Sequence, residues 1–439
     1  MVRGGGWALG GTILSSVLGL IINVLLTRLL PAADVGVYFL LISLVAFCAT
    51  LAQAGVLQVL LRKVALSPSV GERRGAANDI RSACMYIGIG LFIVGFILLF
   101  FFDAWVAKFT PGRSDLNSIV FLIILWTAVL AFQGVVTESF RGFHNIRNAV
   151  LFGGIFTNSL FVIMLSVMYF RGLKPSLTDV VELVVGLVAI ALVVGLSILS
   201  RQIIAVEAGG YLKRIKSIYF EAIPLLLSGL LMLVLSQGDL WIVGLFLGSE
   251  NTAIYGVAAK LAFLTAMPLN LINAILPPHI SQLHAANKLL DLEKLLRVSA
   301  GIASIPAFFM ALGAVFFGKN LLGFLYGEQF RQAGPVLGAL CIGQLCHVAL
   351  GSSGIVLMLT GRGKTLMKIS FFTCLYLVIG GATAASYGVG VMWVGAVAAS
   401  ALVVQKILMC MVVKSGLGIH TCARFDKNFF RILRIFIGK

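Results

Sequence analysis

Residues 7–39 read WALGGTILSSVLGLIINVLLTRLLPAADVGVYF. An apolar run occupies most of this stretch, and its length suits an α-helix that crosses a lipid bilayer, which needs about 20 residues. A short turn with a proline follows at residues 31–34, and a second apolar run begins directly after it. The same alternation of apolar run and short turn recurs along the chain, so the sequence predicts a membrane protein with many helical spans.

The composition supports this prediction. Of the 439 residues, 60% are hydrophobic and only 11% are charged, which leaves too little polar surface for a water-soluble globule. The apolar runs do not alternate with polar residues, so the spans are helices and not the strands of a barrel. The first run is longer than a secretory signal core and has no small-residue cleavage site. We therefore expect an all-α integral membrane protein that retains its first span.

About twelve spans are predicted, with edges that shift by a few residues. They fall into two sets of six, which is the arrangement expected of two helix bundles. The first set covers residues 7–30, 36–61, 83–102, 117–137, 149–170 and 180–200, and the second covers 220–247, 252–280, 298–317, 335–360, 368–387 and 389–413.

The basic residues predict the orientation. Of the 33 Lys and Arg residues, 24 fall in one set of alternate loops, 7 in the other set and 2 within spans. Positive charge stays on the cytoplasmic side, so both chain ends are expected in the cytoplasm. The same distribution accounts for the net charge of +17 without nucleic acid, because basic loops meet anionic lipid headgroups.

A weak internal repeat relates the two halves. A shift of 217 residues aligns residues 30–38 with residues 247–255, and both stretches end a span and restart with an aliphatic-Tyr pair. Repeats with an even number of spans share their orientation and pack about an axis along the membrane normal, with a cavity expected between them. The predicted domains are an N-terminal bundle at 1–216, a C-terminal bundle at 217–413 and a basic amphipathic cytoplasmic tail at 414–439.

Several function classes lack their sequence signals. The seven cysteines form no Cys-x-x-Cys pair and the five histidines have no partner at metal-ligand spacing, so no metal and no cofactor are expected. No P-loop for nucleotide hydrolysis occurs. A membrane enzyme such as a polymerase or acyltransferase generally needs a sizeable outer loop or clustered acid and histidine residues, which this chain lacks.

Polar residues inside spans are the candidate site residues, because they are costly in lipid unless they face protein or water. Asp239 and Lys260 fall at similar predicted depth, so they form either a static ion pair or a functional pair that opens for a substrate or cation. Arg28 either joins an internal site or reaches the headgroups. Small polar residues also allow close helix packing. The substrate-binding candidates are Asn23, Thr27, Arg28, Gln53, Asp239 and Lys260.

Four stretches resemble the polysaccharide transporter flippases of the multidrug/oligosaccharidyl-lipid/polysaccharide (MOP) superfamily. The first is LTRLLPAADVGVYF at residues 26–39, and the second is SFRGFHN at residues 139–145. The other two, QGDLWI at 237–242 and AIYGVAAKL at 253–261, resemble the family's junction between spans seven and eight. The motifs are diffuse, so the resemblance is specific to the family and not to a substrate.

The resemblance implies alternating access around a cationic cavity in a bacterial inner membrane. It implies export of an undecaprenyl-pyrophosphate-linked oligosaccharide for O-antigen, capsule or exopolysaccharide, with membrane lipid and other polysaccharide-assembly proteins as partners. Arg28 and Lys260 would meet the pyrophosphate, and an ion gradient (H⁺ or Na⁺) or the membrane potential would supply the energy. The alternative is a cation-coupled multidrug or metabolite exporter of the same superfamily.

Overall fold

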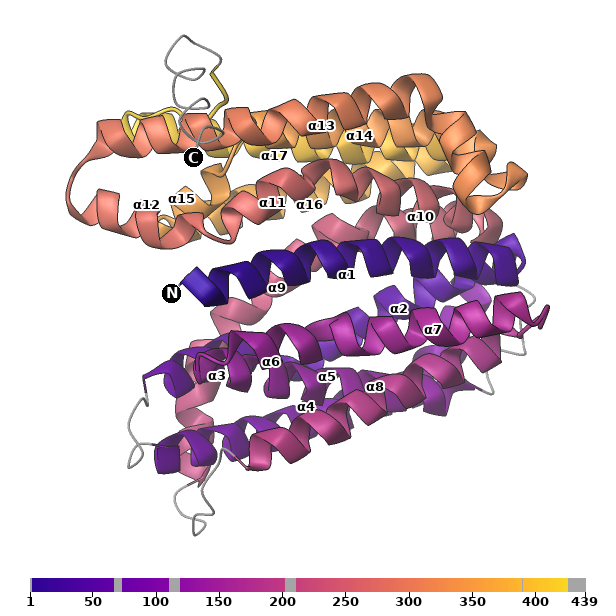
Figure 1. Ribbon diagram of the computed structural model, residues 1–439, viewed down its shortest axis with the longest axis horizontal. Helices are drawn as coiled ribbons and strands as arrows, with labels where there is room; N and C mark the ends of the chain where they lie inside the picture. The colour runs from indigo at the N-terminus through magenta and orange to yellow at the C-terminus, as the bar shows by residue number, and fades with distance from the viewer. Residues whose placement is uncertain (1, 67–72, 110–118, 202–210, 389, 425–439) are drawn as a thin grey trace. The chain divides into compact units, whose positions relative to one another are not determined.

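The computed structural model describes residues 2–66, 73–109, 119–201, 211–388 and 390–424, and these residues form helices and no strand (Figure 1). Eleven helical stretches are long and apolar enough to cross a membrane. One of them, Leu225–Asn273, is 49 residues long and covers two of the predicted spans. The described residues thus account for all twelve predicted spans and confirm the all-α fold class, while the orientation in the membrane stays a prediction.

The chain forms two compact units, each described here by itself. Unit 1 comprises Met1–Leu233 with Gly248–Ala253, and unit 2 comprises Val234–Leu247 with Ile254–Lys439. The division falls inside one long helix, whereas the predicted domain boundary after residue 216 stays a prediction. The predicted amphipathic tail at 414–439 lies outside the described residues from residue 425 onward.

Unit 1 is a bundle of long apolar helices with short breaks. The turn before its last complete helix carries a capping box, in which the Ser176 and Asp179 side chains each accept a hydrogen bond from the other's backbone N–H. The helices are α1 (Val2–Leu29), α2 (Ala32–Gln53), α3 (Val56–Ala65), α4 (Arg73–Phe109), α5 (Val120–Gly142), α6 (Ile146–Val150), the π-helical turn η2 (Leu151–Ile155), α7 (Phe156–Phe170), α8 (Leu177–Ser200) and the start of α9 (Tyr211–Leu247).

Unit 2 contains the end of α9 and the remaining helices. In Figure 1, α13, α14 and α17 run alongside one another, and α14 packs extensively against both neighbours. The helices are α10 (Ser249–Phe263), whose first residues up to Ala253 belong to unit 1, η3 (Leu264–Ala266), α11 (Met267–Asn273), α12 (Leu276–Ala285), α13 (Leu289–Tyr326), η4 (Glu328–Ala333), α14 (Gly334–Leu350), α15 (Ser353–Leu359), α16 (Gly363–Ser386) and α17 (Val391–Leu417).

Some predicted spans are broken helices. The prediction of one continuous span at 36–61 is wrong, because Ala54 (φ 43°) and Gly55 (φ 79°) are left-handed and separate α2 from α3. Gly351 (φ 74°) separates α14 from α15 in the same way. Gly154 (φ 140°) kinks the span at 149–170. A run of apolar residues does not reveal such breaks, because a single glycine in an apolar run changes the hydropathy little.

Small residues allow the helices to pack closely, as in other membrane bundles. In unit 1, a Cβ on Gly36 of α2 would lie 1.8 Å from the carbonyl oxygen of Ser249. In unit 2, a Cβ on Gly343 of α14 would lie 2.8 Å from the Cβ of Ala399 on α17. These contacts fix the register of the helix pairs.

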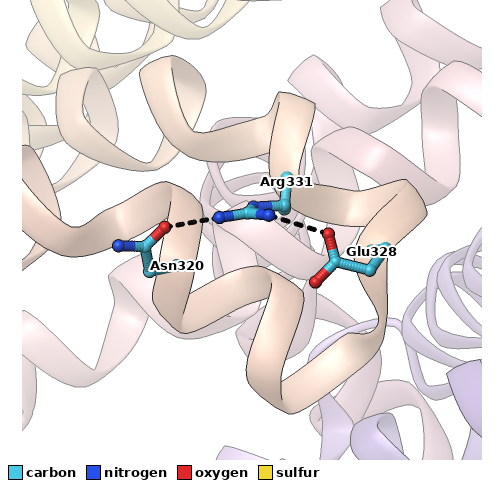
Figure 2. Close-up of polar contacts among 3 residues, drawn as sticks. All are labelled: Asn320, Glu328 and Arg331. Atoms are coloured by element: carbon cyan, nitrogen blue, oxygen red, sulfur yellow. Dashed lines mark hydrogen bonds and ion pairs between the residues drawn. The ribbon is translucent and has the colours of Figure 1, made fainter.

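The turn between α13 and α14 is held by a polar network (Figure 2). The Arg331 guanidinium donates to the Asn320 side-chain oxygen at 2.8 Å and pairs with the Glu328 carboxylate at 2.9 Å. Arg331 and Glu328 are exposed, so this network orders the turn and contributes little to global stability.

Candidate functional site

Asp239 lies on α9 of unit 2, eight residues before the helix ends at Leu247. One carboxylate oxygen accepts a hydrogen bond from the Tyr255 hydroxyl at 2.5 Å, and the other accepts from the backbone N–H of Leu240 at 2.8 Å. Tyr255 belongs to α10 and is completely buried. A hydrogen bond to a charged acceptor inside a bundle is among the stronger polar contacts, so it ties α9 to α10.

Lys260 lies further along α10 and its side chain is exposed on unit 2. The structure shows no ion pair within 4.0 Å between Lys260 and Asp239, and none of the described residues donates to or accepts from the Lys260 side chain. The carboxylate still acts on the ammonium electrostatically. The ion pair expected from their similar depth is therefore replaced by a carboxylate–tyrosine contact, with an exposed ammonium nearby.

Tyr255 was not among the predicted site residues. The signal that could have found it is the internal repeat, since Tyr255 ends the second copy and aligns with Tyr38 in the first. Tyr38 is buried in unit 1, with its ring centroid 6.3 Å from that of Trp126. A residue type kept at equivalent positions of both repeats indicates a shared role in packing, and of these two described tyrosines Tyr255 is the one that donates to a carboxylate.

Three candidates lie on the last two turns of α1 in unit 1. The Thr27 hydroxyl is buried and donates to the carbonyl of Val24 on its own helix at 2.9 Å. Asn23 is half-buried one turn earlier, and Arg28 is exposed. The three therefore cluster at one end of α1, where Thr27 is buried, Asn23 is half-buried and Arg28 is exposed.

Gln53 is the last residue of α2, and its amide donates to the carbonyl of Ala131 on α5 at 3.3 Å. Because α2 starts just after α1 ends, Gln53 is separated from Arg28 by the whole length of α2, about 30 Å at 1.5 Å per residue. The structure thus places Gln53 at the opposite end of the span from Asn23, Thr27 and Arg28. Its contact is typical of a helix-packing residue.

No group of three His, Cys, Asp or Glu side chains is arranged to hold a metal ion among the residues that were placed. The seven cysteines are free thiols. The charged candidate residues can bind ions. Lys260 and Arg28 attract anions, and Asp239 attracts cations.

Comparisons with known proteins bear on the whole chain. A family model described as a polysaccharide biosynthesis protein matches residues 1–284, and the MatE model matches residues 224–383. The probable low-salt glycan biosynthesis flippase Agl15 of Haloferax volcanii is 28% identical over 170 residues. That match spans 37% of this chain and only 34% of the length of the relative.

Two solved structures share the fold. An inward-facing multidrug resistance MATE family transporter of the MOP superfamily has a TM-score of 0.72 at 15% identity, covering 92% of this chain and 94% of its own. The lipid II flippase MurJ, in an inward closed conformation, has a TM-score of 0.69 at 14% identity, covering 97% and 91%. At this identity the likeness shows the fold alone, and the fold is that of MOP superfamily transporters.

The resemblance noted in the sequence motifs is thus confirmed. Since the family model covers well over half of the residues and the described helices form the corresponding multi-pass membrane fold, the chain belongs to the polysaccharide biosynthesis protein family of membrane transporters.

Proposed function

We propose that this protein moves an undecaprenyl-pyrophosphate-linked oligosaccharide from the cytoplasmic to the outer leaflet of a bacterial inner membrane by alternating access. The family match supports a role in polysaccharide biosynthesis, and a relative named as a glycan flippase supports lipid-linked transport. The glycan would serve O-antigen, capsule or exopolysaccharide assembly, in concert with other polysaccharide-assembly proteins.

The observation that carries the proposal is the exposed Lys260 ammonium. Lys260 lies inside a candidate membrane span, where an uncompensated charge costs several kcal/mol. The Asp239 carboxylate acts on the ammonium electrostatically, but no described carboxylate lies within ion-pair distance of it. A pyrophosphate that enters from the membrane would place negative charge at bonding distance and would accept the ammonium's hydrogen bonds. In unit 1, Arg28 is a separate candidate contact for an anion, and Asn23 is a candidate contact for the sugars.

Asp239 is the proposed coupling residue. Of the two carboxylates in the span Leu225–Asn273, Glu250 is exposed in the first turn of α10, whereas Asp239 lies inside α9 and accepts hydrogen bonds from neutral donors. A proton or Na⁺ bound at Asp239 would compete with the Tyr255 hydroxyl for the carboxylate and would change the contact between α9 and α10. The ion gradient or the membrane potential would then drive transport.

Charge reversal at Lys260 tests the substrate contact. In a strain that lacks its own copy of the transporter, Lys260→Glu should abolish surface glycan while the protein still inserts into the membrane fraction. Lys260→Arg should retain transport because it keeps the charge. The matched control is Lys364→Glu, which reverses an exposed lysine at the start of α16 in the same unit. Normal surface glycan with Lys260→Glu would overturn the proposal.

A second candidate function is a cation-coupled exporter of drugs or metabolites, which the MatE match at residues 224–383 favours. Such an exporter binds cationic drugs more readily with exposed acidic residues than with an exposed lysine. Cells that express the chain should then show increased drug resistance, and loss of that resistance in Asp239→Asn with unchanged surface glycan would favour this function over the flippase.

A further inference from the structure

The helices α14 to α17 of unit 2 contain no carboxylate side chain. From residue 329 to residue 425 the sequence has neither Asp nor Glu, so α14, α15, α16 and α17 carry basic residues without a single acidic one. The described carboxylates elsewhere in unit 2 are all engaged by other groups. Asp239 accepts from Tyr255, Asp291 pairs with Lys294, Glu293 with Arg297 and Glu328 with Arg331.

Two basic side chains within this acid-free region lie on neighbouring helices. Gly343 of α14 packs against Ala399 of α17, and further along the Cys410 thiol lies 3.4 Å from the carbonyl oxygen of Leu350. From the first contact to the second, α14 advances from Gly343 to Leu350 and α17 from Ala399 to Cys410, so the two helices run parallel. The turn before Leu350 therefore lies opposite the turn before Cys410. These two turns carry His347 and Lys406, and the charge of Lys406 acts on the His347 imidazole.

Neither group has a hydrogen-bond or carboxylate partner among the described residues, although the Cys410 sulfur acts electrostatically on the Lys406 ammonium. The Nδ1 atom of His347 is buried without a hydrogen bond. Lys406 is half-buried, and no described acceptor lies within bonding distance of its ammonium. A buried polar group without a partner is costly, and a lysine ammonium inside a bundle is more so. The bundle therefore holds two basic groups for which this part of the chain provides no carboxylate.

Lys406 also lies far from the end of its helix. It is eleven residues before the end of α17 at Leu417, a distance of about 16 Å at 1.5 Å per residue. A lysine side chain is much shorter than this. Lys414, by contrast, lies in the last turn of the same helix and is exposed.

We propose that Lys406 and His347 bind a phosphate-bearing anion inside the C-terminal unit, between α14 and α17. The ammonium would neutralise the phosphate charge and the imidazole would donate one N–H to a phosphate oxygen. The ligand comes either from an anionic phospholipid headgroup or from a free pyrophosphate. The proposal does not depend on the proposed substrate, because it rests on the lack of carboxylates and on the positions of two side chains.

Thermal unfolding of the purified full-length protein tests this site. One arm adds sodium pyrophosphate in a neutral detergent, with sodium chloride of equal ionic strength as the reference. The other arm compares nanodiscs of phosphatidylcholine with nanodiscs that also contain phosphatidylglycerol. Stabilisation by pyrophosphate identifies a free polyphosphate ligand, and stabilisation only by phosphatidylglycerol identifies a lipid headgroup.

The variants separate this site from general surface charge. Lys406→Gln should weaken the binding of the stabilising anion by about ten-fold or more, as expected for the loss of one charged hydrogen bond. Lys406→Arg should retain this binding. Lys414→Gln, the control on the same helix, should behave as the unmodified protein. Without anions, Lys406→Met should unfold at a higher temperature, because it removes an uncompensated charge. Equal stabilisation of Lys406→Gln and Lys414→Gln, or no stabilisation of the unmodified protein by either anion, would overturn the proposal.

Discussion

Tyr255→Phe removes one hydroxyl from a fully buried side chain and leaves the ring in place. The lost group donates to the Asp239 carboxylate at 2.5 Å, and its loss leaves that carboxylate with backbone donors such as the Leu240 N–H. Hydrogen bonds to charged groups contribute about 1.5–3 kcal/mol, so the substitution should destabilise unit 2 by about 2 kcal/mol. The ring still fills its site, so no cavity adds to this value.

A double-mutant cycle with Asp239→Asn measures the contact itself. Unfolding of the purified protein in mixed micelles should give a coupling energy of about 1–2 kcal/mol between the two positions, within the range for residues in direct contact. Tyr38→Phe is the control, because Tyr38 is buried at the equivalent position of the first repeat and contacts aromatic rings. A coupling energy below about 0.5 kcal/mol, within the error of additivity, would refute the assigned role of the Asp239–Tyr255 contact.

Three further substitutions test the packing of unit 1 by the same unfolding assay. Gly36→Ala should destabilise the unit by about 1–3 kcal/mol, because the new Cβ would lie 1.8 Å from the carbonyl oxygen of Ser249. Gly154→Ala should cost about 1–3 kcal/mol, because a φ of 140° is strained for any residue with a side chain. Gln53→Leu should lower the free energy of unfolding by about 1 kcal/mol, because the hydrogen bond to the Ala131 carbonyl is lost, and surface glycan should be unchanged. Loss of surface glycan at normal stability would instead indicate that Gln53 contacts the substrate.

Hydropathy predicted the spans of this protein well because the signal is repeated over about 20 residues in each of them. The breaks were not predictable in the same way. A left-handed conformation at Ala54, next to Gly55, changes the backbone without changing the hydropathy of the run. Similarly, the sequence indicates that residues 149–170 span the membrane but not that Gly154 kinks them.

The candidate site was predicted only in part, and the reason is geometric. Depth along the membrane follows from counting residues, so Asp239 and Lys260 were correctly expected on adjacent helices. The direction of each side chain around its helix does not follow from depth, and the Asp239 carboxylate meets Tyr255 while Lys260 is exposed. Gln53 was grouped with the α1 candidates because it is polar, although it ends α2 and contacts α5.

The most direct test of the proposed transport reconstitutes the protein in liposomes with a fluorescent undecaprenyl-pyrophosphate-linked oligosaccharide. A membrane-impermeant glycosidase added outside reports how much of the lipid reaches the outer leaflet. The unmodified protein and Lys260→Arg should raise the accessible fraction above its initial value with time, and Lys260→Glu should leave it unchanged. Equal rates for Lys260→Glu and the unmodified protein, or no movement of the lipid by either, would contradict the account.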